Sequence, residues 1–290
     1  MPDDTHGWLG ATLASILLAC GADPAGPDEA KPKPVTPEPP RVPEAEPAER
    51  STAEDGAETV VPDVSAIEGL RHAQVTVTGT SVRAEVFEVD LRRLRLVGLD
   101  ARTPERSVAA VDDLREEANA HLAVNGTFFD ERERPLGLLV DSGKTLSPLR
   151  QADWGVFTVD RDGTARLVHT KDFHDDAAID FAVQCGPRVV IDGTPPRLKP
   201  QLARRTGLCI EDPRTVAVFV VDELVDASAL ATWLAAAPDT GGLGCTEAVL
   251  LDGGPSTQLD VRGGPKHPTI RGGWPVPNGI AVTDRPKPDP

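Results

Sequence analysis

Residues 248–259 read AVLLDGGPSTQL, a stretch that joins a buried strand to the groups of a binding or catalytic site. The four apolar residues that open it are typical of a strand buried on both faces. Asp252 ends that strand, and the two glycines after it can let a ligand approach the main chain. Ser256 and Thr257 add hydroxyl groups. The pattern predicts an anion site capable of acid–base chemistry, and its structural alternative is a tight corner with a solvated aspartate.

The rest of the sequence divides into an acidic, proline-rich beginning and a longer part that can fold. Residues 1–65 hold 11 of the 28 prolines, with 13 acidic and 4 basic residues. We expect a disordered linker rich in Pro, Glu and Ala over 21–65, a single domain over 66–284 and a short disordered tail over 285–290. The formal net charge of −16 argues against general nucleic-acid binding, because it would repel a phosphate backbone.

The first twenty residues are typical of an export signal. Residues 8–19 form an apolar run of 12, too short to cross a bilayer, and residues 17–20 read LLAC, which resembles a bacterial lipoprotein processing box. The preceding segment has two aspartates and no Lys or Arg, unlike most export signals, so a short buried helix is the alternative. We predict a lipoprotein-type signal peptide over 1–20, lipidation of Cys20 and a domain held at a membrane of the cell envelope, on its periplasmic or extracellular face.

Hydrophobic patterning predicts a domain rich in strands. Alternating apolar and polar residues indicate strands over 82–91 and 94–99, and an almost unbroken apolar run indicates a central strand over 216–222. Short turn sequences separate several further strands. We therefore predict an α+β fold with a mixed, largely antiparallel β-sheet core and a few flanking helices.

Two helices are expected. Thr103-Pro104 has the residues of a helix start and predicts a helix that leads into a strand at 123–124. Asp226 or Ser228 is expected to cap a second helix that runs through Trp233.

The cysteines permit one disulfide. If Cys20 is lipidated, then Cys185, Cys209 and Cys245 remain, and the sequence leaves open which two of them pair. Export makes such a bond permissible. No cysteine pair has the C-x-x-C spacing of a metal site, so we expect neither a metal nor a cofactor.

Further segments, taken in order, resemble the phosphodiester glycosidase family, the family of the uncovering-enzyme catalytic domain. The similar segments are NGTFFD at 125–130, QCGP at 184–187, RT at 205–206, LDGGPST at 251–257 and VPNGIAV at 276–282. Together the similar parts cover most of residues 105–282.

The resemblance implies hydrolysis of a sugar 1-phosphodiester at the anomeric carbon. The leaving group is then a phosphate monoester, a weak base that needs little help from a general acid. The reaction needs a carboxylate that activates water or attacks directly, and donors that hold the phosphate. Asp252 is the predicted principal carboxylate, and Asp130 is a second candidate.

The same resemblance suggests substrate-binding residues. Arg205 is expected to contact the phosphate through its two-pronged guanidinium, although Arg204 lies beside it. Phe128 and Phe129 are expected in the core, and the rings of Trp154 and Trp274 are candidate faces for stacking on a sugar. The other predicted substrate-binding residues are Asn125, Gly126, Gly253, Gly254, Ser256 and Thr257.

Two positions depart from the family pattern. Pro255 stands where a third glycine is usual, and Cys209 stands where the Arg-Thr segment usually has glycine. Three hypotheses follow: an exported hydrolase acting on a glycosyl phosphodiester substrate, a non-catalytic lipoprotein that binds glycans or phosphoglycans, or a metal-assisted phosphodiesterase with Asp252 as a ligand.

Overall fold

The computed structural model describes residues 66–263 and 267–286. The predicted signal peptide, the linker and Cys20 lie outside the described residues, as do the last four residues of the predicted tail. Of the two units into which the chain divides, the one that spans residues 57–290 contains all of the described residues.

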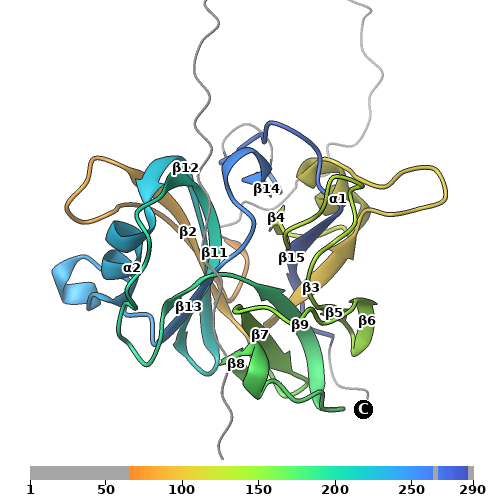
Figure 1. The fold of residues 1–290 in the computed structure, drawn as a ribbon, viewed down its shortest axis with the longest axis horizontal. Helices are drawn as coiled ribbons and strands as arrows, with labels where there is room; N and C mark the ends of the chain where they lie inside the picture. The colour runs from red at the N-terminus through yellow and green to blue at the C-terminus, as the bar shows by residue number, and fades with distance from the viewer. Residues whose placement is uncertain (1–65, 264–266, 287–290) are drawn as a thin grey trace, which may run out of the picture. The chain divides into compact units, whose positions relative to one another are not determined.

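Antiparallel sheets make up most of the domain (Figure 1). The six-stranded sheet runs, in spatial order, β1 (Leu70–Thr76), β2 (Arg83–Asp90), β12 (Thr215–Asp226), β11 (Leu202–Asp212), β13 (Glu247–Leu250) and β10 (Arg188–Val190). The four-stranded sheet runs β14 (Leu259–Val261), β4 (Leu122–Asn125), β15 (Asn278–Asp284) and β3 (Leu94–Asp100). The five-stranded sheet runs β6 (Lys144–Ser147), β5 (Leu139–Asp141), β9 (Ile179–Cys185), β7 (Gly155–Asp160) and β8 (Ala165–His169).

The three sheets share one apolar core. Leu208 and Val218 from the six-stranded sheet, Val124 from the four-stranded sheet, and Phe157 and Val183 from the five-stranded sheet all belong to a single buried cluster. The alternation of apolar and polar residues at 82–91 is typical of a strand with one buried face. The strand β12 is apolar on both faces, because one face contacts the shared core and α-helical residues 227–235 cover the other.

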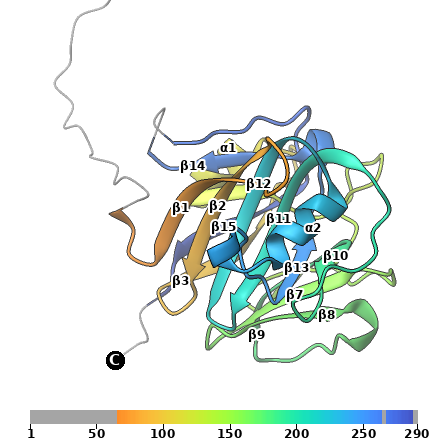
Figure 2. The same ribbon diagram turned by 90° about the vertical axis from the view of Figure 1, so that its left-hand side faces the viewer.

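Two α-helices flank the sheets in the described part of the chain. The helix α1 (Val111–Glu117) packs Val111 and Leu114 on the four-stranded sheet. The helix α2 (Ala227–Ala235) covers the outer face of the six-stranded sheet and buries Trp233 there (Figure 2). None of the described helices has the length and apolar character required to span a membrane.

The expectation for the second helix is confirmed and that for the first is partly wrong. Asp226 caps α2, since its side chain accepts a hydrogen bond from the Ser228 N–H. Thr103 does not begin α1. Its hydroxyl instead accepts from the N–H groups of Glu105 and Arg106 in a turn, and the helix starts only at Val111.

The fold class is confirmed in its antiparallel part and corrected in its balance. The described residues are dominated by strands, and every strand pair among them is antiparallel. The expectation of a mixed sheet was wrong, because most connections are turns and loops rather than the helical crossovers that parallel neighbours need.

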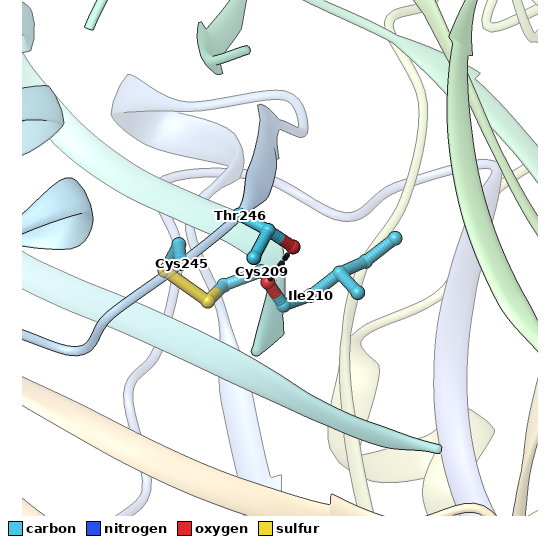
Figure 3. The surroundings of a disulfide bond; sticks show 4 residues. All are labelled: Cys209, Ile210, Cys245 and Thr246. Carbon is cyan, nitrogen blue, oxygen red and sulfur yellow. Dashed lines mark hydrogen bonds between the residues drawn. A yellow bond between two sulfur atoms is a disulfide. The ribbon is translucent and has the colours of Figure 1, made fainter. Parts of the chain in front are cut away.

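The structure settles the cysteine pairing. Cys209 of β11 is bonded to Cys245, which precedes β13, with their Cα atoms 5.6 Å apart (Figure 3). The hydroxyl of Thr246 donates to the Ile210 carbonyl at 2.9 Å and ties the same two segments together. Both cysteines lie in the cluster under α2, and Cys185 is free and buried.

Candidate active site

Asp252 lies where the three sheets come together. It follows β13, whose partner β11 places Gly207 opposite Leu250. The Asp252 N–H donates to the Gly126 carbonyl at 3.1 Å, so the turn after β4 lies against the turn after β13. The end of β9 is also close, since the charge of Asp252 helps to raise the pKa of Cys185.

The Asp252 carboxylate is partly buried and receives two hydrogen bonds. The Gly253 N–H donates to Oδ1 at 3.0 Å, and the Ser256 hydroxyl donates to the same carboxylate. Burial raises the pKa of Asp252 above its ordinary value, and the two donors offset part of that rise because they favour the ionised form. The group is thus a desolvated carboxylate with a fixed direction, which suits a base or a nucleophile.

Trp274 holds Ser256 in its orientation. Its Nε1–H donates to Ser256 Oγ at 3.1 Å, which leaves the serine proton free to point at Asp252. The ring of Trp274 is 50% exposed, while Ser256 is buried. Only a stacking role is expected for Trp274 from the sequence, because the two residues are 18 positions apart and no local pattern links them.

The two glycines of the turn differ in the space beside them. A Cβ on Gly253 would lie 2.8 Å from the Arg204 carbonyl oxygen, whereas a Cβ on Gly254 would meet nothing within 4 Å, and Gly254 is required by its φ of +60°. Pro255 then lies in the first turn of a short 3-10 helix, Gly254–Ser256, where an N–H needs no partner within the helix. The departure at Pro255 is accommodated there without the loss of a hydrogen bond. Thr257 is buried in the same turn and its hydroxyl has no partner.

Asn125 ties this turn to two other strands. Its Nδ2 donates to the Asp252 carbonyl at 2.7 Å, and its Oδ1 accepts from the Thr206 hydroxyl at 2.7 Å and from the Gln258 N–H at 3.1 Å. The side chain is fully buried. Its amide is therefore fully used in hydrogen bonds within the protein. Asn125 holds Asp252 in position and has no free group to bind a substrate.

Gly126 is required by close packing. A Cβ at this position would collide with the side chain of Asn278, whose Oδ1 accepts from the Thr127 N–H at 2.8 Å. Asn278 and Gln184 belong to segments that carry the family resemblance, but the sequence analysis assigns them no role of their own. Gln184 is buried and bridges the Leu138 N–H to the Arg150 backbone, which explains the Gln of the QCGP segment in structural terms.

The two neighbouring arginines differ in what is left for a ligand. Arg204 pairs with Asp222 and also donates to the Thr257 carbonyl at 3.3 Å. Arg205 is 6% exposed, donates one hydrogen bond, to the Gln201 carbonyl at 2.5 Å, and forms no ion pair within the described residues, while the Nε of each arginine is buried without a partner. Burial lowers the pKa of Arg205, and its Cδ lies 4.0 Å from the place of a Cβ on Gly253. Arg205 is thus the arginine that remains available beside the Asp252 turn.

Asp130 has a different setting. Its carboxylate forms an ion pair with Arg134 at 2.6 Å and accepts from the N–H groups of Arg132 and Arg134. These hydrogen bonds lower the pKa of Asp130 to about 2. No hydrogen bond or ion pair links it to the Asp252 turn within the described residues, and its groups serve the local turn.

Aromatic and sulfur groups border the site. Phe128 and Trp154 pack with ring centroids 5.0 Å apart, and a Cβ on Gly186 would meet Trp154 at 2.9 Å. Phe128 and Phe129 pack against core clusters as predicted. Burial raises the pKa of the Cys185 thiol to about 12, so it is not a nucleophile at neutral pH. The described residues contain no group of three His, Cys, Asp or Glu side chains that could hold a metal ion.

A sequence model described as phosphodiester glycosidase matches residues 118–283, more than half of the chain and the whole of the Asp252 site. The chain belongs to the phosphodiester glycosidase family. The fold agrees with that of the zebrafish N-acetylglucosamine-1-phosphodiester alpha-N-acetylglucosaminidase catalytic domain, solved in a form auto-inhibited by its pro-peptide. The TM-score is 0.58 at 15% identity, over 76% of this chain and 85% of that one.

Two further proteins resemble this family member. A hypothetical protein from Synechocystis has a TM-score of 0.50 at 13% identity, over 74% of this chain and 62% of that one. The uncharacterized protein YigE of Escherichia coli K12 is 31% identical over 105 residues, or 33% of this chain. That match spans 41% of the length of YigE.

Proposed function

We propose that the domain hydrolyses a glycosyl phosphodiester, with Asp252 as the catalytic carboxylate. The observation that carries this proposal is the setting of Asp252: desolvated, directed by the Gly253 N–H and the Ser256 hydroxyl, and followed by Gly253, beside which the Arg205 side chain lies. Membership of the family supports the reaction class.

The chemistry follows from the leaving group. The bond between the anomeric carbon and the phosphate oxygen breaks, and its electron pair leaves with the phosphate monoester. Asp252 either takes a proton from the attacking water or attacks the anomeric carbon itself, after which water releases the sugar. In both cases the water oxygen ends on the sugar. Because the leaving phosphate is a weak base, no second carboxylate has to protonate it, which agrees with the separate setting of Asp130.

The surrounding residues have distinct proposed roles. Arg205 holds the phosphate through its guanidinium. Asn125, Ser256 and Trp274 are positioning residues, because each acts through Asp252 or its turn. Gly254, which has open space beside its Cα, allows the phosphate to approach the backbone, while Gly253 gives room to the Arg204 carbonyl.

Both departures from the family pattern are compatible with activity. Pro255 fits the start of a 3-10 helix, and Cys209 forms a disulfide on the face of the sheet that packs against α2. Neither removes a group that contacts the Asp252 carboxylate. A catalytic protein is therefore favoured over a binding protein on the same fold.

The test uses a chromogenic sugar 1-phosphodiester in oxygen-18 water. Label in the released sugar is the expected result. Label in the phosphate would instead indicate cleavage at phosphorus, and binding without turnover would indicate a non-catalytic glycan-binding protein. Asp252→Asn is expected to lower kcat by at least about 10³-fold, since it removes the reacting group. Asp130→Asn is the matched control and should keep most of the activity.

We also propose that the protein is exported and lipid-anchored at the cell envelope. The LLAC segment that ends at Cys20 suggests the anchor, and the Cys209–Cys245 bond suits an oxidising compartment. Cys20→Ser should abolish incorporation of a labelled fatty acid and release the protein from the membrane fraction. Unchanged membrane association of that variant would exclude lipidation at Cys20.

A further inference from the structure

A cationic hollow adjoins the Asp252 turn. It has a volume of about 450 Å³, and Arg188, Arg197, Lys199 and Arg205 line it together with Gln201 and Asp153. This volume falls within the range of small-molecule sites and exceeds what a single phosphate group requires.

Arg205 connects this hollow to the site. Its side chain lines the hollow, while its Cδ lies 4.0 Å from the place of a Cβ on Gly253, the residue after Asp252. Pro187 and Asp153, which also line the hollow, are the chain neighbours of Gly186 and Trp154, which pack on each other. Arg205 is thus the residue that the hollow and the surroundings of the Asp252 turn have in common.

The cations of the hollow have carboxylates nearby but no close ion pair in the described part of the chain, since Asp153 and Glu247 act electrostatically on Arg188 without forming one. Within the described residues, none of its four cationic side chains forms an ion pair. Its one carboxylate, Asp153, is bonded to His169 at 2.7 Å. Asp226 attracts Arg205 electrostatically, but its oxygens are occupied by the N–H groups of Gln201 and Ser228. Four cations thus line one hollow in a chain with a net charge of −16, and the buried Nε of Arg205 lacks a hydrogen-bond partner.

We propose that this hollow binds a second phosphate, carried by the leaving group of the substrate. The inference rests on the proposed function and names the substrate class: a glycosyl phosphodiester whose leaving portion bears a further phosphate, as in a chain of repeated phosphodiesters. Arg205 holds the phosphate that is cleaved from the sugar. Arg188, Arg197 and Lys199 hold the next one, since they line the same hollow as Arg205 and form no ion pair within the described residues.

The first test compares two substrates in the intact domain. They share one sugar 1-phosphate and differ in whether the leaving alcohol carries a phosphate. Arg197 and Lys199 are exposed, so Arg197→Gln/Lys199→Gln should fold normally. The unaltered protein is expected to favour the substrate with the phosphorylated leaving alcohol at least about tenfold in kcat/KM. The double variant should lose most of that preference, while its kcat/KM for the substrate without the extra phosphate changes less than about twofold.

The matched control removes the same charge elsewhere. Arg132→Gln/Lys144→Gln alters two exposed cations outside the hollow and should leave the preference intact. Equal kcat/KM for the two substrates in the unaltered protein would overturn the proposal, and so would an equal effect of the two double variants, which would reflect net charge alone.

A binding experiment separates this inference from the proposed function. Titration calorimetry with inorganic pyrophosphate and with inorganic phosphate needs no turnover. Pyrophosphate is expected to bind at least about tenfold more tightly than phosphate, and Arg197→Gln/Lys199→Gln should abolish the difference. If that result is obtained without any hydrolysis of sugar phosphodiesters, the anion site stands and the proposed activity fails. Hydrolysis with no preference for pyrophosphate would retain the activity and overturn the second phosphate site.

Discussion

At the scale of single residues, the ionisation of Asp252 controls the proposed reaction. The carboxylate must be ionised to act, so activity falls as the pH drops through the pKa of Asp252 in the folded protein. The Ser256 hydroxyl lowers that pKa, against the larger effect of burial. Ser256→Ala should therefore move the acidic limb of the kcat/KM profile to higher pH.

A second variant tests the hydrogen bonds that run from Trp274 through Ser256 to Asp252. Trp274→Phe keeps the ring but removes the Nε1–H that orients Ser256, so it should move the acidic limb in the same direction by a smaller amount. A uniform loss of kcat at every pH, with the limb unmoved in both variants, would show that these residues act on structure alone.

The same carboxylate is expected to lower the stability of the fold. Its folded-state pKa lies above the unfolded value, so the stabilisation present at low pH is lost as the pH rises through that range. At neutral pH, Asp252→Asn should therefore raise the free energy of unfolding while it removes activity. Urea unfolding at pH 5 and pH 8 measures this, and a variant less stable than the unaltered protein at pH 8 would contradict the assignment of a desolvated carboxylate.

Sequence patterns identified which residues lie in the site more successfully than they identified what each residue does there. Asn125 was found as an amide on a glycine turn, but its partners Thr206 and Gln258 lie 81 and 133 positions away along the chain. They come together because β14, which follows Gln258, pairs with β4, and because the end of β4 lies against β11 of another sheet. An asparagine amide that is open to a ligand and one that is hydrogen-bonded within the protein have the same local sequence. A positioning role therefore could not be distinguished from a binding role.

At the scale of elements, the strand β11 carries an uncommon carboxyl group. Burial and the nearby Glu88 and Asp212 raise the pKa of Glu211 to about 7, and Arg71 offsets part of this. The unfolded value is about 4.3. The folded state therefore holds a proton that the unfolded state has lost, and stability falls as the pH rises from about 4.3 to about 7.

Replacement of this group should remove that pH dependence. Glu211→Gln is expected to raise the free energy of unfolding by about 1–2 kcal/mol at pH 8 and by less at pH 5. Chemical denaturation at the two pH values measures the difference. Glu131→Gln, at an exposed loop position, is the control and should change neither value. An equal gain at both pH values would indicate packing rather than ionisation.

Element boundaries show where local signals failed. Asp226 was identified as a helix cap because its side chain reaches the N–H of Ser228, a contact made entirely within one turn. Thr103 has a similar local signature, yet the side chain of Arg106 donates to the Ala101 carbonyl and pairs with Glu117, which holds this segment as a loop. The second contact comes from the end of α1 and has no signature near Thr103.

At the scale of the whole molecule, the antiparallel fold was predictable and the meeting of its sheets was not. Alternating patterns indicate which strands have one buried face, but they do not indicate which sheet a strand joins. The cationic hollow has the same origin. Arg188 follows β9 and the cis peptide Gly186-Pro187, Arg197 and Lys199 lie in the next loop, and Arg205 belongs to β11. A cluster assembled from separate segments has no fixed spacing for a sequence to display.

The disulfide closes a loop of 36 positions between β11 and the segment before β13, and this loop contains β12 and α2. Such a cross-link restricts the unfolded chain and is worth about 3–4 kcal/mol in the chain-entropy model. Cys209→Ser/Cys245→Ser should lower the free energy of unfolding by about that amount, and a reducing agent should do the same to the unaltered protein. Cys185→Ala, which removes the free thiol, is the control. Reduction should lower the stability of this variant by as much as it lowers that of the unaltered protein.

Because β13 leads directly into Asp252, the reduced protein should also lose activity at a lower temperature than the oxidised one. If reduction left both the midpoint of thermal unfolding and that of inactivation unchanged, the bond would not hold the strand that positions the carboxylate.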